Sequence, residues 1–352
     1  MNAASRPDVL CEELLEAAVA APSADNRHCF ELEWEDGTLL VRGNVAFDHA
    51  LHHRKVLALI SFGAVVENVC VRAARLGYRT RIRWFPDPSQ PALVARIELV
   101  DRVAPVPSIV SRDMAIATRH TNRSVFYSGP SLTEDELVHF ADAVADIDGV
   151  SLFFCDTGTR RARLAQLIGI AERERFERYP LHRELFSSIR FDVGWKASAQ
   201  FGLPPGALAV EPGARLMFQG LRHWPVMNAL RRVGLSRLLA FRAASLPARL
   251  APHRGVLTTR LPLESGAARV GMALQRVWLE AETRGLALQP FAGAPLLALP
   301  GYDDVSSDTR TLLQRGWRHL TDELPLMVFR LGRAKRVRVF AGRPAGEAFL
   351  RH

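Results

Sequence analysis

The chain of 352 residues is 48% hydrophobic and 24% charged, a balance typical of a folded protein with one large or two ordinary domains, which excludes a largely disordered chain. Its net charge of +9 comes from arginines spread along the whole chain without a nucleic-acid-binding module, so we expect no nucleic-acid partner. No stretch approaches ~20 uninterrupted apolar residues, and residues 1–17 carry acids where a signal peptide needs an apolar run, so we expect no membrane partner and a cytoplasmic location.

The first part of the chain mixes helical and strand patterns. In chain order we expect a helix over 9–22, two strands within 28–44, a helix over 51–77, and strands over 78–85 and 92–100. Asp36-Gly37 between the first two strands is a strong hairpin signal, and Gly77 is suited to end the second helix. Residues 105–111 are expected to form a connector.

A second group of elements follows residue 117. Ser131 stands three residues before Glu134, which predicts a capping box at the start of a helix. In chain order we expect a helix within 131–147, a strand over 150–156, a helix over 159–179, a helix and a strand within 267–299, a helix over 307–320 and a strand over 325–332. Residues 185–250 have no counterpart in the first part and are expected to be an insertion that covers a site.

An internal repeat is visible in the two long apolar helices. Residues 61–78 and 269–286 align without a gap, and the matched pairs are Gly63 with Gly271, Val69 with Val277, Ala73 with Ala281 and Gly77 with Gly285. Shared helical patterning alone is the alternative explanation. We predict an α+β fold of two tandem related halves, residues 1–110 and 111–352, each a β-sheet flanked by helices. Together they would form an intrachain pseudo-dimer with a ligand site between them.

Three short segments carry residues suited to a phosphorylated ligand. They are Pro22–Asn26, Arg119–Arg123, and a late stretch from Arg330 to Arg343. Paired arginines with an interleaved hydroxyl can grip a phosphate, and a Pro-Ser-x-x-Asn turn offers a hydroxyl and an amide. Taken singly, each segment is more simply explained as a turn or a solvated helix cap.

The cysteines are scattered and have no histidines at metal-binding spacing. This favours reduced, mostly buried thiols and no metal site. The four positions are Cys11, Cys29, Cys70 and Cys155.

Taken together and in this order, the three segments resemble the nitroreductase superfamily, and most of all its single-chain, two-half branch of Acg-like flavoproteins. That resemblance implies a nitroreductase-like fold and bound FMN. It places Pro22, Ser23 and Asn26 against the flavin. The phosphate and ribityl chain would be gripped by the second segment and the late basic residue, namely Arg119, Thr121, Asn122, Arg123 and Arg343.

The resemblance extends to residues 285–293, where Ala292 and Gly293 would present backbone amides to flavin N5. It weakens within residues 185–250 and at His28-Cys29-Phe30, where the family has Gln-Pro-Trp. His28 or Cys29 would either approach the flavin or simply begin a strand, and base rates favour the strand start. His120 is a further candidate only as a hydrogen-bond donor.

Each half holds motifs that the other lacks, which predicts one composite flavin site per chain, in a monomer with internal pseudo-symmetry or in a homodimer. The resemblance implies ping-pong hydride transfer from NAD(P)H through FMN to a small molecule such as a nitroaromatic, a quinone or an activated alkene. Two alternatives stay open. One is an FMN-storage protein without turnover, and the other is a flavin-dependent dehydrogenase acting on a biosynthetic intermediate.

Overall fold

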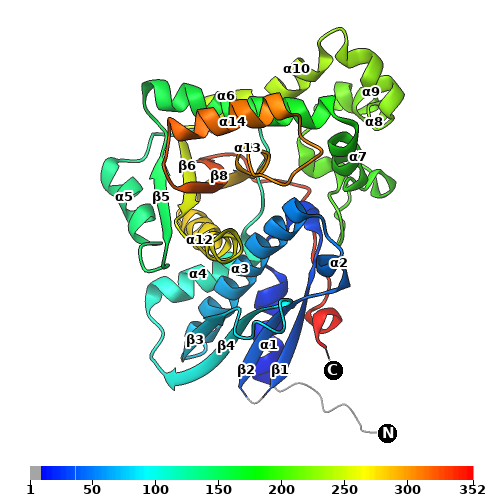
Figure 1. Ribbon diagram of the computed structural model, residues 1–352. Helices are drawn as coiled ribbons and strands as arrows, with labels where there is room; N and C mark the ends of the chain where they lie inside the picture. Colours follow the sequence, from blue (N-terminus) through cyan, green and yellow to red (C-terminus); the bar gives the residue numbers. More distant parts are fainter. Residues whose placement is uncertain (1–8, 36, 352) are drawn as a thin grey trace, which may run out of the picture.

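The computed structural model describes residues 9–35 and 37–351, which form an α+β structure on two four-stranded antiparallel sheets (Figure 1). The first sheet has the strand order β1-β2-β4-β3 and the second has the order β5-β6-β8-β7, so both sheets repeat one arrangement. The strands are β1 (Phe30–Glu35), β2 (Thr38–Gly43), β3 (Tyr78–Trp84), β4 (Leu93–Arg102), β5 (Val150–Phe154), β6 (His253–Thr259), β7 (Ala287–Phe291) and β8 (Leu324–Gly332).

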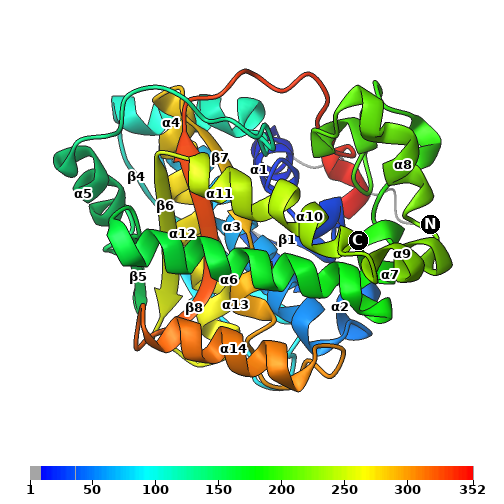
Figure 2. The ribbon, with the colours of Figure 1, turned by 90° about the horizontal axis from the view of Figure 1, so that it is seen from above.

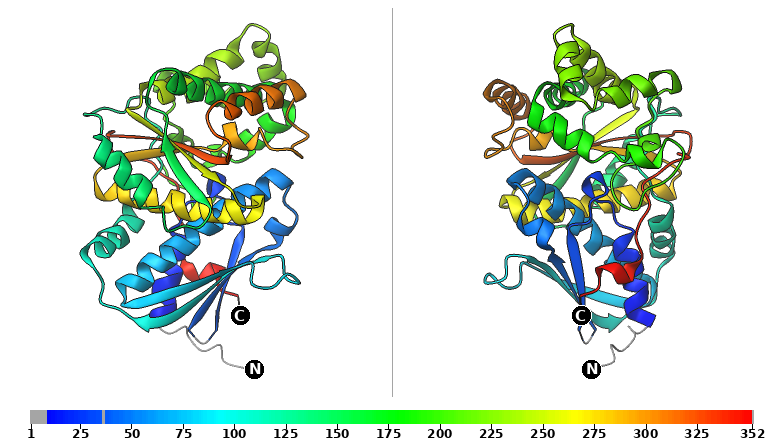
Figure 3. Two further views of the ribbon diagram at one scale, coloured as in Figure 1. Left: turned by 60° about the vertical axis from the view of Figure 1, so that its left-hand side comes forward. Right: turned by 90° about the vertical axis from the view of Figure 1, so that its right-hand side faces the viewer.

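Two long helices lie between the sheets, as both views of Figure 3 show. Along the chain, α3 (His52–Arg75) lies between β2 and β3, the second and third strands of the first sheet. α12 (Leu263–Thr283) lies at the same point of the second half, between β6 and β7. Gly77 and Gly285 follow them with φ of +85° and +66°, values that glycine adopts readily at a helix end. The predicted order of helix, glycine and strand is therefore present in both halves.

The two central helices approach each other closely because glycines face their crossing. A Cβ atom on Gly63 would collide with the backbone carbonyl of Ala268, and one on Gly271 would collide with that of Ile60. These glycines are the pair matched in the sequence repeat. The contact is therefore reciprocal, as expected where equivalent helices of two related halves meet.

α3 is also long and apolar enough to cross a membrane by length and composition. In the fold, however, 83% of its apolar 18-residue window is buried inside the protein. The main hydrophobic core surrounds α3 and α12, and residues of both sheets contribute to it. The apolar character of α3 is accounted for by this central position.

The remaining elements cover the sheets and one end of the molecule (Figure 2). Outside the insertion they are α1 (Val9–Val19), η1 (Ala24–Asn26), α2 (Val45–Asp48), α4 (Pro107–Thr118), α5 (Glu134–Asp142), α6 (Gly158–Glu177), α13 (Gly293–Leu296), α14 (Ser307–Arg318) and η6 (Gly346–Phe349). α7 (Tyr179–Ser187) leads into the insertion, which continues with η2 (Phe191–Val193), η3 (Pro205–Leu208), η4 (Pro212–Ala214), α8 (Arg215–Gly220), α9 (Trp224–Arg231), α10 (Leu235–Ala240), the π-helical η5 (Phe241–Ser245) and α11 (Leu246–Leu250).

The chain after β8 returns to the first half (Figure 1). Isolated bridges join Arg333 to Ser128, Ala341 to Ala199 in the insertion, and Leu350 to Leu32 in β1. η6 then packs against α1. This C-terminal tail, residues 333–351, thus ties together the second half, the insertion and the first sheet.

Several boundaries differ from those predicted from the sequence. Residues 105–111 are not a plain connector, because Pro107 takes the first position of α4, where its missing N–H costs nothing. The expected boundary between residues 110 and 111 falls inside this helix. The capping box of α5 is formed by Thr133 and Glu136, two residues later than expected. The predicted hairpin pairs Glu35 with Thr38, whereas Asp36 lies outside the described residues.

Candidate functional site

A cavity of about 740 Å³ lies where the two halves, the insertion and the C-terminal tail meet. This volume falls within the range of ~300–1,000 Å³ typical of small-molecule and cofactor sites. Nine of the ten predicted site residues line it: Pro22, Ser23, Asn26, Arg119, Thr121, Arg123, Ala292, Gly293 and Arg343. Segments that are far apart in the sequence, and that were predicted to converge, therefore share one cavity.

The turn before β1 forms part of the cavity wall. Asp25 and Asn26 both have positive φ, at +54° and +55°, a conformation that costs non-glycine residues about 1–3 kcal/mol each. The Ser23 hydroxyl is buried here and has no hydrogen-bond partner among the described residues. A strained turn thus presents an unsatisfied hydroxyl beside the cavity.

Asn26 lines the cavity, but its side-chain amide makes hydrogen bonds within the protein. Its side-chain nitrogen donates to the backbone carbonyls of Ala199, Gln200 and Gly202, at 3.2, 3.0 and 3.1 Å. Its side-chain oxygen accepts from Arg343 Nη1 at 2.6 Å. The amide predicted to contact a flavin is thus already used within the protein.

Arg119, at the C-terminal end of α4, is almost completely buried. Its guanidinium lies 4.4 Å from the centre of the Trp278 ring, and Nη2 donates to the Ala20 carbonyl at 3.2 Å. Its Nε has no hydrogen-bond partner in the described part of the chain. Burial, followed by the nearby charge of Arg343, lowers the pKa of Arg119 to about 9.

Two more arginines reach the same cavity. Arg123 donates to the Ala207 carbonyl at 3.4 Å, and burial lowers its pKa. Arg343 donates to Asn26 and, through Nε, to the Ala21 carbonyl at 3.2 Å, and burial lowers its pKa to about 10. Within residues 9–35 and 37–351, no carboxylate forms an ion pair with these two arginines or with Arg119.

Of the three residues between Arg119 and Arg123, two line the cavity and the third makes contacts within the loop that follows α4. Thr121 and His120 line the cavity, and the His120 ring stacks on Phe340 at 4.0 Å. Burial, then the charges of Arg119 and Arg343, lower the pKa of His120 to about 4, so it is neutral at pH 7.

Asn122 does not line the cavity, contrary to the sequence prediction. Its side-chain amide donates to the Lys335 carbonyl at 2.8 Å and its oxygen accepts from the Ser124 N–H at 3.0 Å. Asn122 therefore holds the loop against the C-terminal tail.

His28 and Cys29 do not line the large cavity either; they line an adjoining one of about 470 Å³. The His28 ring makes edge contacts with Phe30, Phe201 and Phe349. Cys29 packs against the main core. The structure thus agrees with the simpler of the two interpretations, in which this segment begins a strand.

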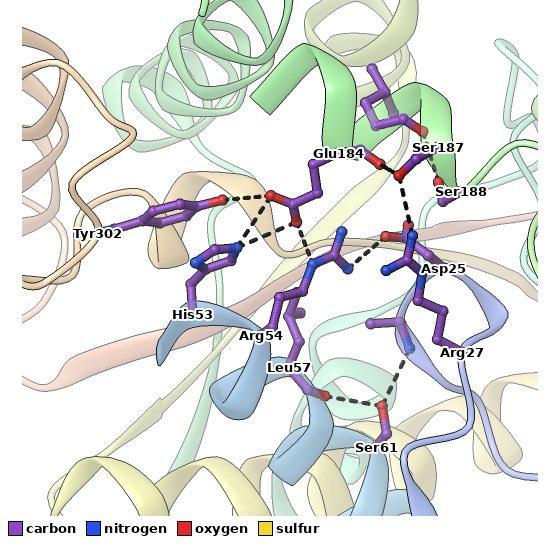
Figure 4. A network of polar contacts seen from close by, with 12 residues as sticks. Asp25, Arg27, His53, Arg54, Leu57, Ser61, Glu184, Ser187, Ser188 and Tyr302 are labelled. Carbon is purple, nitrogen blue, oxygen red and sulfur yellow. Dashed lines mark hydrogen bonds and ion pairs between the residues drawn. The ribbon is translucent and has the colours of Figure 1, made fainter. Parts of the chain in front are cut away.

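A polar network on the cavity wall was missed in the sequence (Figure 4). Arg54 donates to Asp25 at 2.7 Å and also pairs with Glu184 of α7. Glu184 further contacts His53 Nε2 at 3.2 Å and accepts from the Tyr302 hydroxyl at 3.3 Å. Residues 52–55 are polar at the start of an otherwise apolar helix, and this was the only indication of the network in the sequence. The side chains that they contact lie in distant segments.

The network fixes the charge of its central acid. Burial by itself would raise the pKa of Glu184, but the hydrogen bond from His53 and the charge of Arg54 lower it to about 2. The His53 ring stacks on Tyr302 with centroids 3.6 Å apart. Glu184 is therefore ionised at neutral pH and holds α7 against α3.

The chain was compared with known proteins by sequence and by structure. No family model matches it. It is 24% identical over 307 residues to the uncharacterized protein MT1398 of Mycobacterium tuberculosis. The match covers 86% of this chain but only 41% of that protein, so the chain spans less than half of its relative's length.

Solved structures with similar elements include three nitroreductases. Nitroreductase A from Vibrio parahaemolyticus shares 12% identity over 64% of this chain and 68% of that chain, with a TM-score of 0.34. The FMN-dependent nitroreductase NfnB from Mycobacterium smegmatis, in complex with NADPH, shares 16% over 69% and 98%, with a TM-score of 0.37. A nitroreductase with bound FMN from Desulfitobacterium hafniense shares 15% over 67% and 95%, with a TM-score of 0.35. Similarities at this level assign no function to this chain.

Proposed function

We propose that this chain is an FMN-dependent oxidoreductase of the nitroreductase type, with one flavin per chain in the cavity between its halves. One observation carries the proposal. Arg119 and Arg123 from one segment and Arg343 from the C-terminal tail converge on this cavity; Arg119 is buried, Arg123 and Arg343 are half-buried, and no carboxylate pairs with them among the described residues.

Buried and half-buried cations without carboxylate partners favour an anionic ligand. Removing a charged group from water costs several kcal/mol unless a partner of opposite charge compensates it. The carbonyl contacts of these arginines supply only part of that compensation. A phosphate offers several oxygens to guanidinium groups and satisfies them with charge-assisted hydrogen bonds.

The other polar groups at the cavity suit the rest of a flavin nucleotide. The unsatisfied Ser23 hydroxyl and Thr121 would bind ribityl hydroxyls. Pro22 and the segment with Ala292 and Gly293 would flank the ring. When bound, FMN supplies the ping-pong transfer of hydride from NAD(P)H through N5 to a nitroaromatic, a quinone or an activated alkene. The chain itself positions the reactants and excludes water.

The first test is the absorption spectrum of the purified protein. We expect a yellow protein that releases one FMN per chain on denaturation. A colourless protein that does not take up added FMN would rule the proposal out.

Arg123 gives a residue-level test of the same site. Arg123→Ala should weaken FMN binding by about 2–3 kcal/mol, the value of a charge-assisted contact, as measured by equilibrium titration of the apoprotein. Arg237→Ala is the matched control, because Arg237 is exposed on α10 and does not line the cavity. Equal FMN affinity in the two variants would remove Arg123 from the site.

A second candidate is FMN storage without turnover. It is favoured by one observation, namely that residues between Leu203 and Leu246 of the insertion contribute a large part of the cavity wall. A steady-state assay with NAD(P)H and menadione separates the two candidates. A reductase consumes NAD(P)H continuously, whereas in a storage protein the bound flavin stays oxidised.

A further inference from the structure

The insertion gives the cavity a second compartment, chemically unlike the arginine end. Its large apolar side chains belong to the small hydrophobic cluster that holds the insertion together, and the same side chains also line the cavity. We call this wall the apolar compartment. Its main residues are Leu185, Ile189, Leu208, Phe218, Leu235 and Leu239.

Charged groups near this compartment are already paired. Glu211 and Arg242 form an ion pair, and Arg175 contacts Glu172 at 3.0 Å. The arginines at the other end have no such partners among the described residues. A second phosphorylated group would require unpaired cations, so the adenine nucleotide part of NAD(P)H does not suit this compartment.

The helix beside the compartment changes its hydrogen-bond pattern at the cavity. Phe241–Ser245 is π-helical, and Phe241, Ala243 and Ala244 line the cavity. Pro247 follows closely and has no N–H for a regular helical bond. Single π-helical turns are rare and occur frequently at functional sites. This irregularity is a second, independent sign of a binding region.

The compartment also opens to solvent through apolar side chains. Leu238, Met217 and Phe241 line the cavity, yet they are 62%, 48% and 42% exposed. Large apolar groups gathered at the rim of a cavity are characteristic of ligand-binding grooves. An extended apolar group has a route from solvent into the compartment.

We propose that the apolar compartment binds an extended apolar chain carried by the molecule that is reduced. The reducible head of that molecule would lie near Gln289–Gly293, and its chain would lie between α7, α8 and α10. This inference rests on the proposed function for the head, but the chain site can be tested without a flavin.

The test compares two quinones that share one head. Menadione has no chain, and the second probe is the same naphthoquinone with a short isoprenoid chain. Quenching of tryptophan fluorescence in the purified protein gives both dissociation constants. We expect the chain-bearing quinone to bind at least about 100-fold more tightly, because the chain is removed from water in the compartment.

Two variants connect this preference to the compartment. Ala243→Trp, at an exposed position on the rim, should narrow the compartment and reduce the preference at least about tenfold without changing menadione affinity. Leu239→Asp should do the same by placing a charge in the apolar wall. Leu216→Trp is the control, because Leu216 is 85% exposed in the same insertion and does not line the cavity.

Each outcome decides one question. Equal affinities for the two quinones, or a preference that survives both Ala243→Trp and Leu239→Asp, would overturn the chain site. Competition by ADP-ribose would assign the compartment to the nucleotide donor and overturn it as well. If the protein is colourless but still binds the chain-bearing quinone more tightly, the chain site is supported and the proposed flavin is wrong. If the protein is yellow but binds both quinones equally, the flavin is supported and the chain site is wrong.

Discussion

His28 is a residue whose environment determines its charge. The ring is buried and touches Phe30, Phe201 and Phe349, and the nearby Gln200 backbone offsets only part of the effect of burial on its charge. Burial, followed by the charge of Arg343, lowers the pKa of His28 from 6.5 to about 4. Between pH 6.5 and about 4, His28 therefore binds a proton in the unfolded chain but stays neutral in the folded protein.

This difference predicts a loss of stability in weak acid. The free energy of unfolding keeps its full contribution from neutral His28 above pH 6.5. About 3 kcal/mol of this free energy is lost as the pH falls to 4. In His28→Phe, the loss of unfolding free energy between pH 7 and pH 5 should shrink by about 2 kcal/mol, as measured by denaturant titration at both values. Some loss remains, because the pKa of His120 is lowered in the same direction.

The matched control is His49→Phe, at an exposed position on the same half. In this control the loss of unfolding free energy between pH 7 and pH 5 should persist, because the buried His28 ring is still present. If His28→Phe and His49→Phe show the same pH dependence, His28 is protonated in the folded protein and this explanation is wrong.

The sequence correctly predicted which segments meet at the cavity. It was less successful in predicting the role of each side chain within those segments. Arginines followed by small polar residues identified the cavity segments. Asn26 and Asn122 have equally suitable amides, but both bind backbone carbonyls of distant segments. The partners of His53 and Arg54 could not be found either, because Glu184 lies in α7, 131 residues after His53 along the chain. Long-range hydrogen bonds have no local pattern that reveals them.

Among the elements, α3 and α12 depend on close contact at their crossing. Gly63→Ala should lower the free energy of unfolding by at least about 2 kcal/mol, because the added methyl group meets the backbone of Ala268 and the helices must separate. Gly271→Ala should have a similar effect through the carbonyl of Ile60. Denaturant unfolding of each variant measures the change.

Gly220→Ala in α8 provides the control, since a Cβ there meets no atom within 4 Å. It should leave stability unchanged or raise it slightly, because alanine favours helix over glycine. If Gly63→Ala is as stable as Gly220→Ala, the crossing is looser than described, and the reciprocal glycine contact does not hold the halves together.

Periodicity predicted the long elements well and failed where tertiary burial overrides it. The repeat of α3 and α12 was visible because both carry the same spacing of small and apolar residues. β6, His253–Thr259, was missed because every residue in it is buried on both sides, so no alternation marks it. α4 was missed because Pro107, which begins it, was interpreted as a mark of a connector.

Across the whole molecule, the site is composite because the chain crosses between its halves more than once. The first half supplies Pro22–Asn26 and the start of α3, the second supplies Arg119–Arg123, and the tail returns with Arg343. The order of motifs predicted this convergence, since each half lacked what the other held. The path of the tail and the fold of the insertion were not predictable, because both are determined by contacts outside the repeat.

Asn26 is where three parts of the molecule meet, and it gives a prediction at this scale. Asn26→Ala would remove the side-chain donor to the carbonyls of Ala199, Gln200 and Gly202 and one of the acceptors of Arg343. Losing buried hydrogen bonds costs about 1–3 kcal/mol each. Backbone amide exchange should therefore accelerate about ten- to a hundredfold across residues 199–202 and 341–343, because local opening becomes easier.

The central helices define the control region for this experiment. Exchange in α3 and α12 should not change in Asn26→Ala, since local opening of the insertion and tail leaves the main core intact. Asn228→Ala is the matched variant. Asn228 also lies in the insertion, but in the described part of the chain its side chain accepts only from Arg231 in the same helix. Acceleration confined to residues 199–202 and 341–343 would mean that the insertion and tail open together, because one side chain joins both to the first half. Acceleration spread equally over α3 and α12 would mean that Asn26 supports the whole fold, and the insertion would then not open as a separate unit.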